Sequence, residues 1–337
     1  MREVEKIMEN SYPRLIADIG GTNARFAIET IKFKYEHTLV LACKDYKGLS
    51  DAINNYLVQV GFEQKIKNAA IALPSPEVQD IYQMVNSPWQ AFSAKKTKQE
   101  SDLDNLLLLN DFHALSLSIP FIARNNLIRL GGLRAPDETK PIAIIGPGTG
   151  LGMATLIKTP LGDYFSIPSE GGRSSFAPVN EEEIELWRFV HKRFSHVSFE
   201  RFISGSGLQL IYEGLYSINK RVLDRLPEPS EIVDLGINNK DWISRQTVEI
   251  FCRMFGTVAS NLAVIVNSFG GLYIGGGIVP KMVDFFIKSE FRSRFEDKGR
   301  YRPYLVNMPI YIIMEEFPAF LGASYALDTY LTKGYIP

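Results

Sequence analysis

Two stretches of the chain repeat one pattern of apolar and glycine positions. In residues 15–28, an apolar run ends in Gly20-Gly21-Thr22 and is followed by a second apolar run. In residues 142–156, an apolar run ends in Gly146-Pro147-Gly148-Thr149 and is again followed by a second one. Short apolar runs on either side of a glycine turn are typical of a buried β-hairpin. The repeat predicts a structural duplication in which each half opens with a glycine-rich hairpin.

The rest of the chain alternates between strand and helix patterns. Residues 68–73, 106–109 and 272–274 are short apolar runs of the kind that form buried strands. From Asn180 onward apolar residues recur at helical spacing, and a longer apolar helix is expected over 244–267. Helices mixed with strands and hairpins predict an α/β fold whose sheets are not purely parallel.

The composition narrows the possible functions. The chain has 337 residues, which favours two domains over one compact core. Its 37 basic and 38 acidic side chains nearly balance, whereas a protein that binds nucleic acid through charge needs a basic excess. Cys43 and Cys252 form no CxxC motif and suggest no disulfide framework. No apolar run has the length of a membrane span, so we expect a soluble, cytoplasmic protein that binds no membrane.

The first glycine turn has the chemistry of a phosphate-binding loop. Gly20 and Gly21 let backbone N–H groups approach phosphate oxygens, and Thr22 adds a hydroxyl donor. Asp18, at the end of the preceding strand, could hold a hydrated Mg²⁺ beside those phosphates. An ordinary tight hairpin with a capping aspartate fits the same residues, so this segment alone leaves both interpretations open.

Two later glycine clusters can likewise be interpreted either as ligand-binding turns or as purely structural ones. Residues 146–152 lack the third glycine of the dinucleotide fingerprint and the Gly-Lys-Ser/Thr ending of a P-loop. What remains is a less specific cradle that phosphate could occupy. Gly275-Gly276-Gly277 follow an apolar strand, and three glycines in a row indicate a close approach of the backbone to another group. That group is either a flat adenine ring or a neighbouring helix.

Carboxylates near strand ends or glycines are candidates for proton and sugar chemistry. Asn110-Asp111 follows the strand at 106–109, and ligands of open α/β sheets bind at the carboxyl ends of strands. Asp111 could accept a hydroxyl proton as a general base, or it could cap the helix that follows. Glu170 and Glu200 could accept hydrogen bonds from a polyol, although isolated glutamates are usually solvated surface groups. The four histidines show no metal-ligand spacing.

In this order, these segments resemble the bacterial glucokinase family within the sugar kinase/Hsp70/actin superfamily. The resemblance runs from about residue 15 to about residue 326, nearly the whole chain. The motifs that carry it are DIGGTNARFAI, LNDFHALSLSIP, IGPGTGLG, SEGGRSSFAP, SHVSFERFISGSGL and GGLYIGGGIVP. It implies an α/β, two-domain actin-like ATPase (ribonuclease H-like) fold with an interdomain active-site cleft. The small domain is expected at residues 1–121 plus about 315–337, and the large domain at 122–314.

The resemblance also implies a role for each candidate residue. Asp111 would take the proton from the 6-hydroxyl of glucose while ATP donates its γ-phosphoryl group, giving glucose 6-phosphate and ADP. The sugar would be held by Asn86, Asn110, Asp111, Glu170, Arg173 and Glu200. The nucleotide would be held by Ala17, Asp18, Ile19, Gly20, Gly21, Thr22, Gly148, Thr149, Gly150, Gly275, Gly276 and Gly277, with Asp18 binding Mg²⁺ through water. The family further implies a homodimer.

One departure from the family lies on the sugar side. Where the family usually has GEGGH, with the histidine touching sugar hydroxyls, this chain has SEGGR over residues 169–173. Arginine is longer, permanently charged and only a donor. The guanidinium of Arg173 could reach the same hydroxyls, pair with Glu170 or Glu200, or point to solvent. A kinase for another hexose or an amino sugar, and a non-catalytic sugar-binding regulator, therefore stay as alternatives to a glucokinase.

Overall fold

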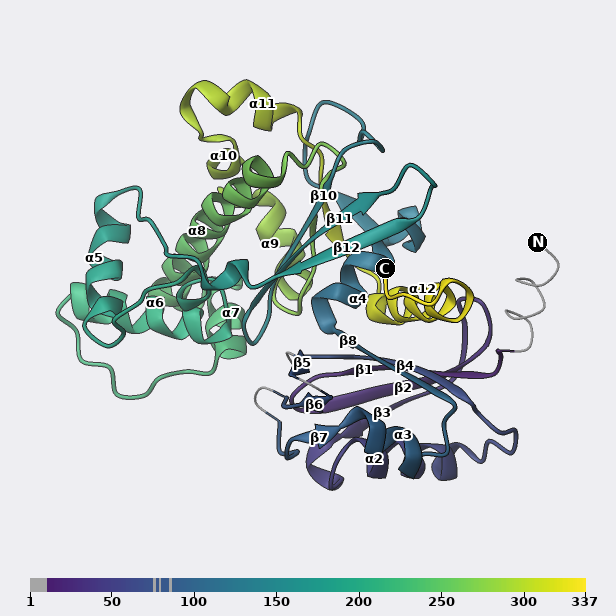
Figure 1. Cartoon of the computed structure of the whole chain (residues 1–337). Coiled ribbons are helices and arrows are strands. Elements are labelled where there is room, and N and C mark those ends of the chain that lie inside the picture. The colour runs from purple at the N-terminus through teal and green to yellow at the C-terminus, as the bar shows by residue number, and fades with distance from the viewer. Residues whose placement is uncertain (1–10, 75–76, 79, 85–86) are drawn as a thin grey trace. The chain divides into compact units, whose positions relative to one another are not determined.

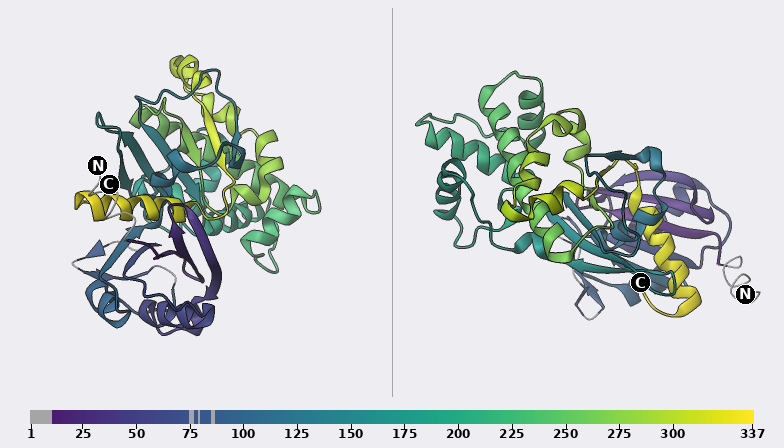
Figure 2. Two further views of the ribbon diagram at one scale, coloured as in Figure 1. Left: turned by 90° about the vertical axis from the view of Figure 1, so that its right-hand side faces the viewer. Right: turned by 90° about the horizontal axis from the view of Figure 1, so that it is seen from above.

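The computed structural model describes residues 11–337 except 75–76, 79 and 85–86, so the predicted sugar ligand Asn86 lies outside the described residues. The chain divides into two compact units. Unit 1 consists of the residues up to Ala123, Tyr164–Ser166 and Glu315–Pro337; unit 2 consists of Arg124–Asp163 and Ile167–Met314. Figure 1 labels the elements of each unit, and Figure 2 shows them from two further sides.

The main sheet of unit 1 has the strand order β3-β2-β1-β4-β8. β1 is antiparallel to β2 and parallel to β4, and β4 is parallel to β8. Leu15, Ala17 and Ile19 of β1 pack into one core together with helix α2 (Leu49–Val60), as the two-residue period of a strand requires. The strands are β1 (Arg14–Ile19), β2 (Asn23–Ile31), β3 (Lys34–Ala42), β4 (Asn68–Leu73) and β8 (Asn105–Asn110), with a small separate sheet of β5 (Glu77–Val78), β6 (Ile81–Tyr82) and β7 (Phe92–Ser93).

The main sheet of unit 2 has the strand order β12-β11-β10-β13-β14-β9. Its first five strands repeat the chain order of the unit 1 sheet, third-second-first-fourth-fifth, with a glycine-rich turn after the central strand. The central strand is again antiparallel to one neighbour and parallel to the other. The predicted structural duplication is therefore confirmed. The strands are β9 (Leu127–Arg129), β10 (Ile142–Pro147), β11 (Leu151–Lys158), β12 (Tyr164–Ser169), β13 (Leu272–Ile274) and β14 (Ile310–Ile313).

The helices follow the expected mixed pattern. In unit 1, α4 (Asp111–Ser118) and α12 (Pro318–Lys333) cover one face of the sheet, and α2 and α3 (Ala94–Glu100) lie on the other (Figure 1). The helix predicted from Asn180 is α5, and the Asn180 side chain caps it by accepting the Glu183 N–H. The helices of unit 2 are α5 (Glu181–His191), α6 (Gly205–Ile218), α7 (Pro229–Ile237), α8 (Trp242–Val266), α9 (Val283–Lys288), α10 (Phe291–Glu296) and α11 (Arg302–Asn307).

Helix α8, which the sequence predicted over 244–267, is the centre of the unit 2 core. It packs against α6, α7 and α10. Among the described residues it is the one helix that is long and apolar enough to cross a membrane, and 67% of its apolar window is buried inside the protein. Burial on that scale is typical of the core helix of a globular unit.

A buried cluster of charges fastens α12 to the unit 1 sheet. Arg14, at the start of β1, is fully buried, and its Nη1 lies 2.5 Å from Asp328 Oδ1 on α12 and 3.6 Å from Glu29 Oε2 on β2. The Lys32 ammonium lies 2.9 Å from the other oxygen of Asp328. A buried charge is tolerated when it is paired, so these contacts fix where α12 crosses the sheet.

Helix α12 also approaches α4 very closely. A Cβ at Gly322 would stand 1.7 Å from the carbonyl oxygen of Ala114, a distance that no side chain can occupy. The glycine therefore sets the approach of α12 to α4, the helix whose first residue is Asp111.

Gly322→Ala is expected to destabilise the protein by at least roughly 1–3 kcal/mol, because the added methyl forces the two helices apart. Chemical unfolding measures this change. Gly48→Ser is the control, since a Cβ at Gly48 would meet no atom within 4 Å and serine is favoured at this N-cap of α2, so stability should not fall. A Gly322→Ala variant with the same free energy of unfolding as wild type would contradict the close approach of α12 to α4.

Candidate active site

The first glycine turn joins β1 to β2 and is braced by residues outside it. Gly20 N–H donates to the Asn23 carbonyl across the turn at 2.8 Å. Cys43, directly after β3, donates its N–H to the Thr22 carbonyl at 2.8 Å and its thiol to the Gly20 carbonyl at 3.4 Å. The indole N–H of Trp89 donates to the Cys43 carbonyl at 2.8 Å. Cys43 and Trp89 thus position the turn, a role that no sequence motif indicated.

Asp18 lies at the end of β1 beside this turn. Its side chain is 24% exposed, and its Oδ2 lies 3.4 Å from Nη1 of Arg25, its cross-strand neighbour on β2. Burial raises the pKa of the Asp18 carboxyl, and Arg25 opposes that shift by favouring the ionised form. A carboxylate in this position can accept hydrogen bonds from the water shell of a metal ion.

The end of β8 carries Asn110 and Asp111. The Asn110 Oδ1 accepts the N–H groups of Phe112 and His113 at 2.9 and 3.2 Å, so Asn110 is the N-cap of α4. Asp111 is the first residue of α4, and its Oδ1 accepts the Phe112 N–H at 2.8 Å. Asn110 is thus the N-cap residue, and Asp111 also accepts an N–H of the first turn, in part as the capping alternative expected. Backbone dipoles at a helix N-terminus favour a carboxylate there.

These two segments of unit 1 share one edge of its sheet. β1, β4 and β8 are parallel, so their carboxyl ends lie together. In the register, Asp18 pairs with Ala72 of β4, and Ala72 pairs with Leu109 of β8, one residue before Asn110. The first turn, Asp18 and Asn110-Asp111 therefore meet at the edge where ligands of open α/β sheets bind.

The second glycine turn joins β10 to β11 and contacts Glu200. Gly148 N–H donates to the Gly150 carbonyl at 2.8 Å within the turn. Leu151 N–H donates to Glu200 Oε2 at 2.9 Å. A Cβ at Gly150 would lie 2.4 Å from that oxygen, so this glycine makes room for the carboxylate. A Cβ at Gly148 would meet no protein atom within 4 Å, so packing does not account for this glycine.

Gly275-Gly276-Gly277 lie against the start of the second turn. Gly275 N–H donates to the Ile145 carbonyl of β10 at 2.9 Å. Gly276 has a φ of 78°, and a Cβ there would lie 2.4 Å from the Pro147 carbonyl oxygen, so the fold itself requires glycine at this position. Gly277 differs, because a Cβ there would have no neighbour within 4 Å.

The SEGGR turn, residues 169–173, packs against the hairpin of β10 and β11. A Cβ at Gly172 would lie 2.2 Å from the Leu151 carbonyl oxygen, so only glycine allows this approach. Arg173 N–H donates to the Glu170 carbonyl at 2.9 Å and closes the turn. The N–H of Phe199 donates to the carbonyl of the residue after Arg173 at 2.8 Å. This bond brings the turn beside the segment that carries Glu200.

Arg173 pairs with the glutamates of this region. Its Nη1 lies 3.0 Å from Glu200 Oε1, and its Nε lies 4.0 Å from Glu170 Oε2. The side chains of Arg173 and Glu170 are 64% and 83% exposed, whereas that of Glu200 is 24% exposed. Of the three positions that the sequence left open for the guanidinium, the structure shows pairing with the glutamates.

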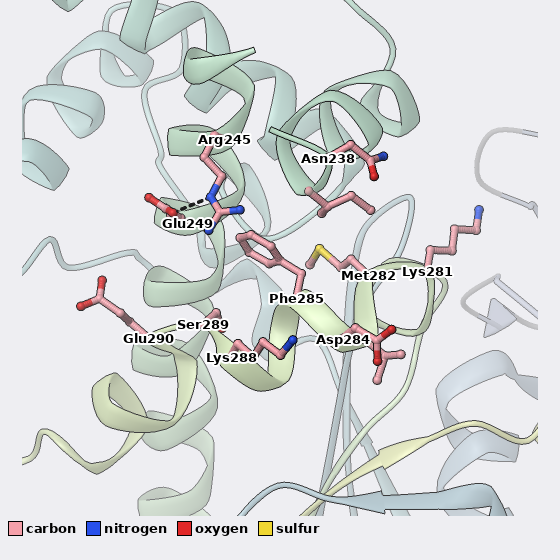
Figure 3. Close-up of a pocket in the computed structure, with 12 residues that line it drawn as sticks. Asn238, Arg245, Glu249, Lys281, Met282, Asp284, Phe285, Lys288, Ser289 and Glu290 are labelled. Atoms are coloured by element: carbon pink, nitrogen blue, oxygen red, sulfur yellow. Dashed lines mark hydrogen bonds and ion pairs between the residues drawn. The ribbon is translucent and has the colours of Figure 1, made fainter. Parts of the chain in front are cut away.

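Unit 2 contains a cavity of about 650 Å³, a volume within the usual range for small-molecule sites. Figure 3 shows the side chains that line it. One wall begins at Lys281, four residues after Gly277, and continues along α9. Other walls come from the end of α7 and from α8, where Arg245 Nε lies 2.7 Å from Glu249 Oε1. None of the described residues that the sequence predicts for the site is among the residues lining this cavity.

Comparisons with known proteins point to one family. The sequence model of the Glucokinase family matches residues 15–330. The chain is 45% identical to a glucokinase of Neisseria gonorrhoeae over 95% of this chain and 96% of that protein. It is 41% identical to a glucokinase of Campylobacter jejuni subsp. doylei over 96% of each.

Solved structures give the same picture. The crystal structure of a glucokinase from an Antarctic psychrotroph has a TM-score of 0.81 at 31% identity, over 93% of this chain and 98% of that one. A ROK family glucokinase from Streptomyces griseus in complex with glucose and AMPPNP has a TM-score of 0.63 at 18% identity, over 92% of this chain and 98% of that one. The second likeness shows the fold alone. The predicted α/β fold of the actin-like ATPase type is confirmed.

The raised pKa of Asp18 predicts a pH-dependent stability. A raised pKa means that the folded state holds the Asp18 proton more tightly than the unfolded chain does. The stability that this group contributes is therefore full below its ordinary pKa of 3.8 and is lost as the pH rises through the raised value. Asp18→Asn removes this loss, so the free energy of unfolding of the variant relative to wild type should increase as the pH rises from about 4 to neutrality.

Urea unfolding across that pH range measures the difference. Asp104→Asn is the control of opposite sign, because the hydrogen bond and charge of Lys67 lower the pKa of Asp104. If the difference in free energy of unfolding between Asp18→Asn and wild type did not change with pH, the raised pKa of Asp18 would be contradicted.

Proposed function

Because the chain belongs to the glucokinase family, we propose that it transfers the γ-phosphoryl group of ATP to the 6-hydroxyl of glucose, giving glucose 6-phosphate and ADP. The family membership makes it an ATP-dependent sugar kinase, a phosphotransferase. One observation supports the assignment of residues most: the first glycine turn and Asp111 follow strands whose carboxyl ends share an edge of the unit 1 sheet.

Asp111 is the proposed general base. Asn110 is the N-cap residue of α4, and the Phe112 N–H bonded to Asp111 Oδ1 orients the Asp111 carboxylate at the helix N-terminus. The sugar O6 bonds to the γ-phosphorus while the bond from that phosphorus to the departing ADP oxygen breaks, and Asp111 accepts the O6 proton. Phosphoryl transfer needs little from a protein beyond positioning, charge neutralisation and such an acceptor.

The glycine turns are the proposed nucleotide site. Residues 17–22 and Gly148-Thr149-Gly150 would bind phosphates through backbone N–H groups, and Gly275-Gly276-Gly277 would line the adenosine. The open space at Gly148 and Gly277 supports this proposal, because a close ligand explains glycine where protein packing does not. The cavity that begins at Lys281 follows these glycines along the chain and has room for the base end of a nucleotide.

Mg²⁺ belongs to the same proposal. Within the part of the chain that the structure describes, no three His, Cys, Asp or Glu side chains form a metal-binding group. A site with few protein ligands fits Mg²⁺, because this ion keeps several waters and takes one or two carboxylates together with substrate phosphates. Asp18 would hold the ion through water, and the ion would neutralise charge on the phosphates.

The proposed sugar ligands present mostly acceptor atoms, which suit the hydroxyls of a hexose. Leu151 N–H occupies one oxygen of Glu200 and thereby orients the other oxygen. The proposed ligands are Asn86, Asn110, Asp111, Glu170, Arg173 and Glu200.

We also propose that the enzyme is a cytoplasmic homodimer. The proposal of a dimer rests on the family resemblance. The proposal of a reducing compartment is supported by Cys43 and Cys252, which are both free thiols buried in the fold.

A valine at Gly148 tests the nucleotide turn. Gly148→Val places a branched side chain where no protein atom lies within 4 Å, so the fold should keep its stability. It should raise the KM for ATP by about 10- to 100-fold, because charge-assisted backbone bonds to phosphate are lost. Gly48→Val, which also enters open space, is the control and should leave the KM unchanged. Unfolding, or an equal loss of glucose binding measured by calorimetry, would favour a purely structural role for the turn.

Asp111→Asn tests the proposed base. The variant should fold normally and lose about 10²–10⁴-fold in kcat, because the amide cannot accept the hydroxyl proton. A coupled ADP-release assay with ATP, Mg²⁺ and a panel of hexoses measures both this loss and the preference for glucose. Asp51→Asn, which alters another carboxylate in the first turn of a helix, should keep wild-type kcat. Wild-type turnover in Asp111→Asn would refute the base, and sugar binding without ADP release would point to a non-catalytic regulator.

A further inference from the structure

Three charges of unit 2 stand together where the proposed function places the sugar ligands. Arg173 lies between Glu170 and Glu200, with Nη1 3.0 Å from one carboxylate and Nε 4.0 Å from the other. Two carboxylates with one guanidinium carry a net charge of one negative unit, whereas the carboxylates alone would carry two. The electrostatic character of this region therefore depends on a single side chain.

We propose that Arg173 determines sugar specificity by neutralising one of these two carboxylates, so that neutral hexoses are favoured over hexoses that carry an ammonium group. The inference rests on the proposed function, because it takes Glu170 and Glu200 as acceptors for sugar hydroxyls. An ammonium group would be attracted by two free carboxylates. Beside Arg173 it meets a like charge instead.

The backbone keeps Arg173 at the glutamates. Glu200 cannot move away without losing its bond from Leu151 N–H, at 2.9 Å. Gly172 is held against the Leu151 carbonyl, where any side chain would clash. Both partners of the ion pair are thus attached to the same hairpin, and the guanidinium stays within side-chain reach of the carboxylates even when the pair opens.

The exposure of Arg173 decides how a neutral sugar competes. The Arg173 side chain is 64% exposed, so its ion pair with Glu200 is weak. The paired state is favoured over the open state by only about 1.4- to 5-fold. A sugar hydroxyl can therefore replace the guanidinium at Glu200 with a small loss of affinity. The repulsion of an ammonium group is relieved less, because the guanidinium stays within a side-chain length of the carboxylates, inside the screening distance of physiological salt.

The test compares two sugars that differ at one position, glucosamine and 2-deoxyglucose. In Arg173→Gln, the ratio of kcat/KM for glucosamine to that for 2-deoxyglucose should rise by about 3- to 30-fold over wild type, mainly through KM. Arg173→Lys keeps the charge and should keep the wild-type ratio. Arg201→Gln removes a guanidinium of the neighbouring turn, which stacks on Phe194, and should also leave the ratio unchanged.

Salt gives a second readout that a merely structural role would not move. The difference between Arg173→Gln and wild type in the glucosamine to 2-deoxyglucose ratio should shrink as the salt concentration rises to about 0.5 M, because screening weakens the repulsion. An unchanged ratio in Arg173→Gln, or an equal change in Arg201→Gln, would overturn the proposal. If wild type phosphorylates no hexose, the proposed function fails, and calorimetric binding of the two sugars to the same variants still tests the role of Arg173.

Discussion

The site in unit 2 depends on the position of one carboxylate, that of Glu200. One of its oxygens accepts the Leu151 N–H in a space that only a glycine at position 150 leaves open. The other oxygen faces the Arg173 guanidinium. If Glu200 moved, the second glycine turn would lose a side-chain partner and the SEGGR turn its counter-charge. Within unit 2, the proposed phosphate turn and the proposed sugar ligands Arg173 and Glu200 therefore cannot be positioned independently of each other.

In unit 1, different residues stabilise the fold and form the proposed site. The buried cluster of Arg14, Glu29 and Asp328 secures α12 near the start of β1, while Asp18 lies near the other end of that strand. Gly322 then sets how closely α12 approaches α4, and α4 carries Asp111 at its first residue. The strand order recurs in unit 2, so one arrangement of strands presents a glycine turn at the end of each central strand.

The two hairpins, strands β4, β8 and β13, and helix α8 could be predicted because they follow from local apolar and glycine patterns, whereas β3, β12 and β14 were not predicted. Contacts between distant segments could not be predicted. Glu183 is fully buried on α5 because Arg294, 111 residues further on, pairs with it. Cys43 braces the first turn only because β3 returns to it. The sequence likewise left three positions open for Arg173, since its pairing with Glu200 depends on how two separate turns pack.

The most direct test of this account is a crystal structure of the protein with bound glucose. We expect a sugar hydroxyl to donate to Glu200 Oε1 in place of the Arg173 guanidinium, while Leu151 N–H stays bonded to Oε2. A complex in which Arg173 keeps its contact with Glu200 and the sugar touches neither glutamate would contradict the account.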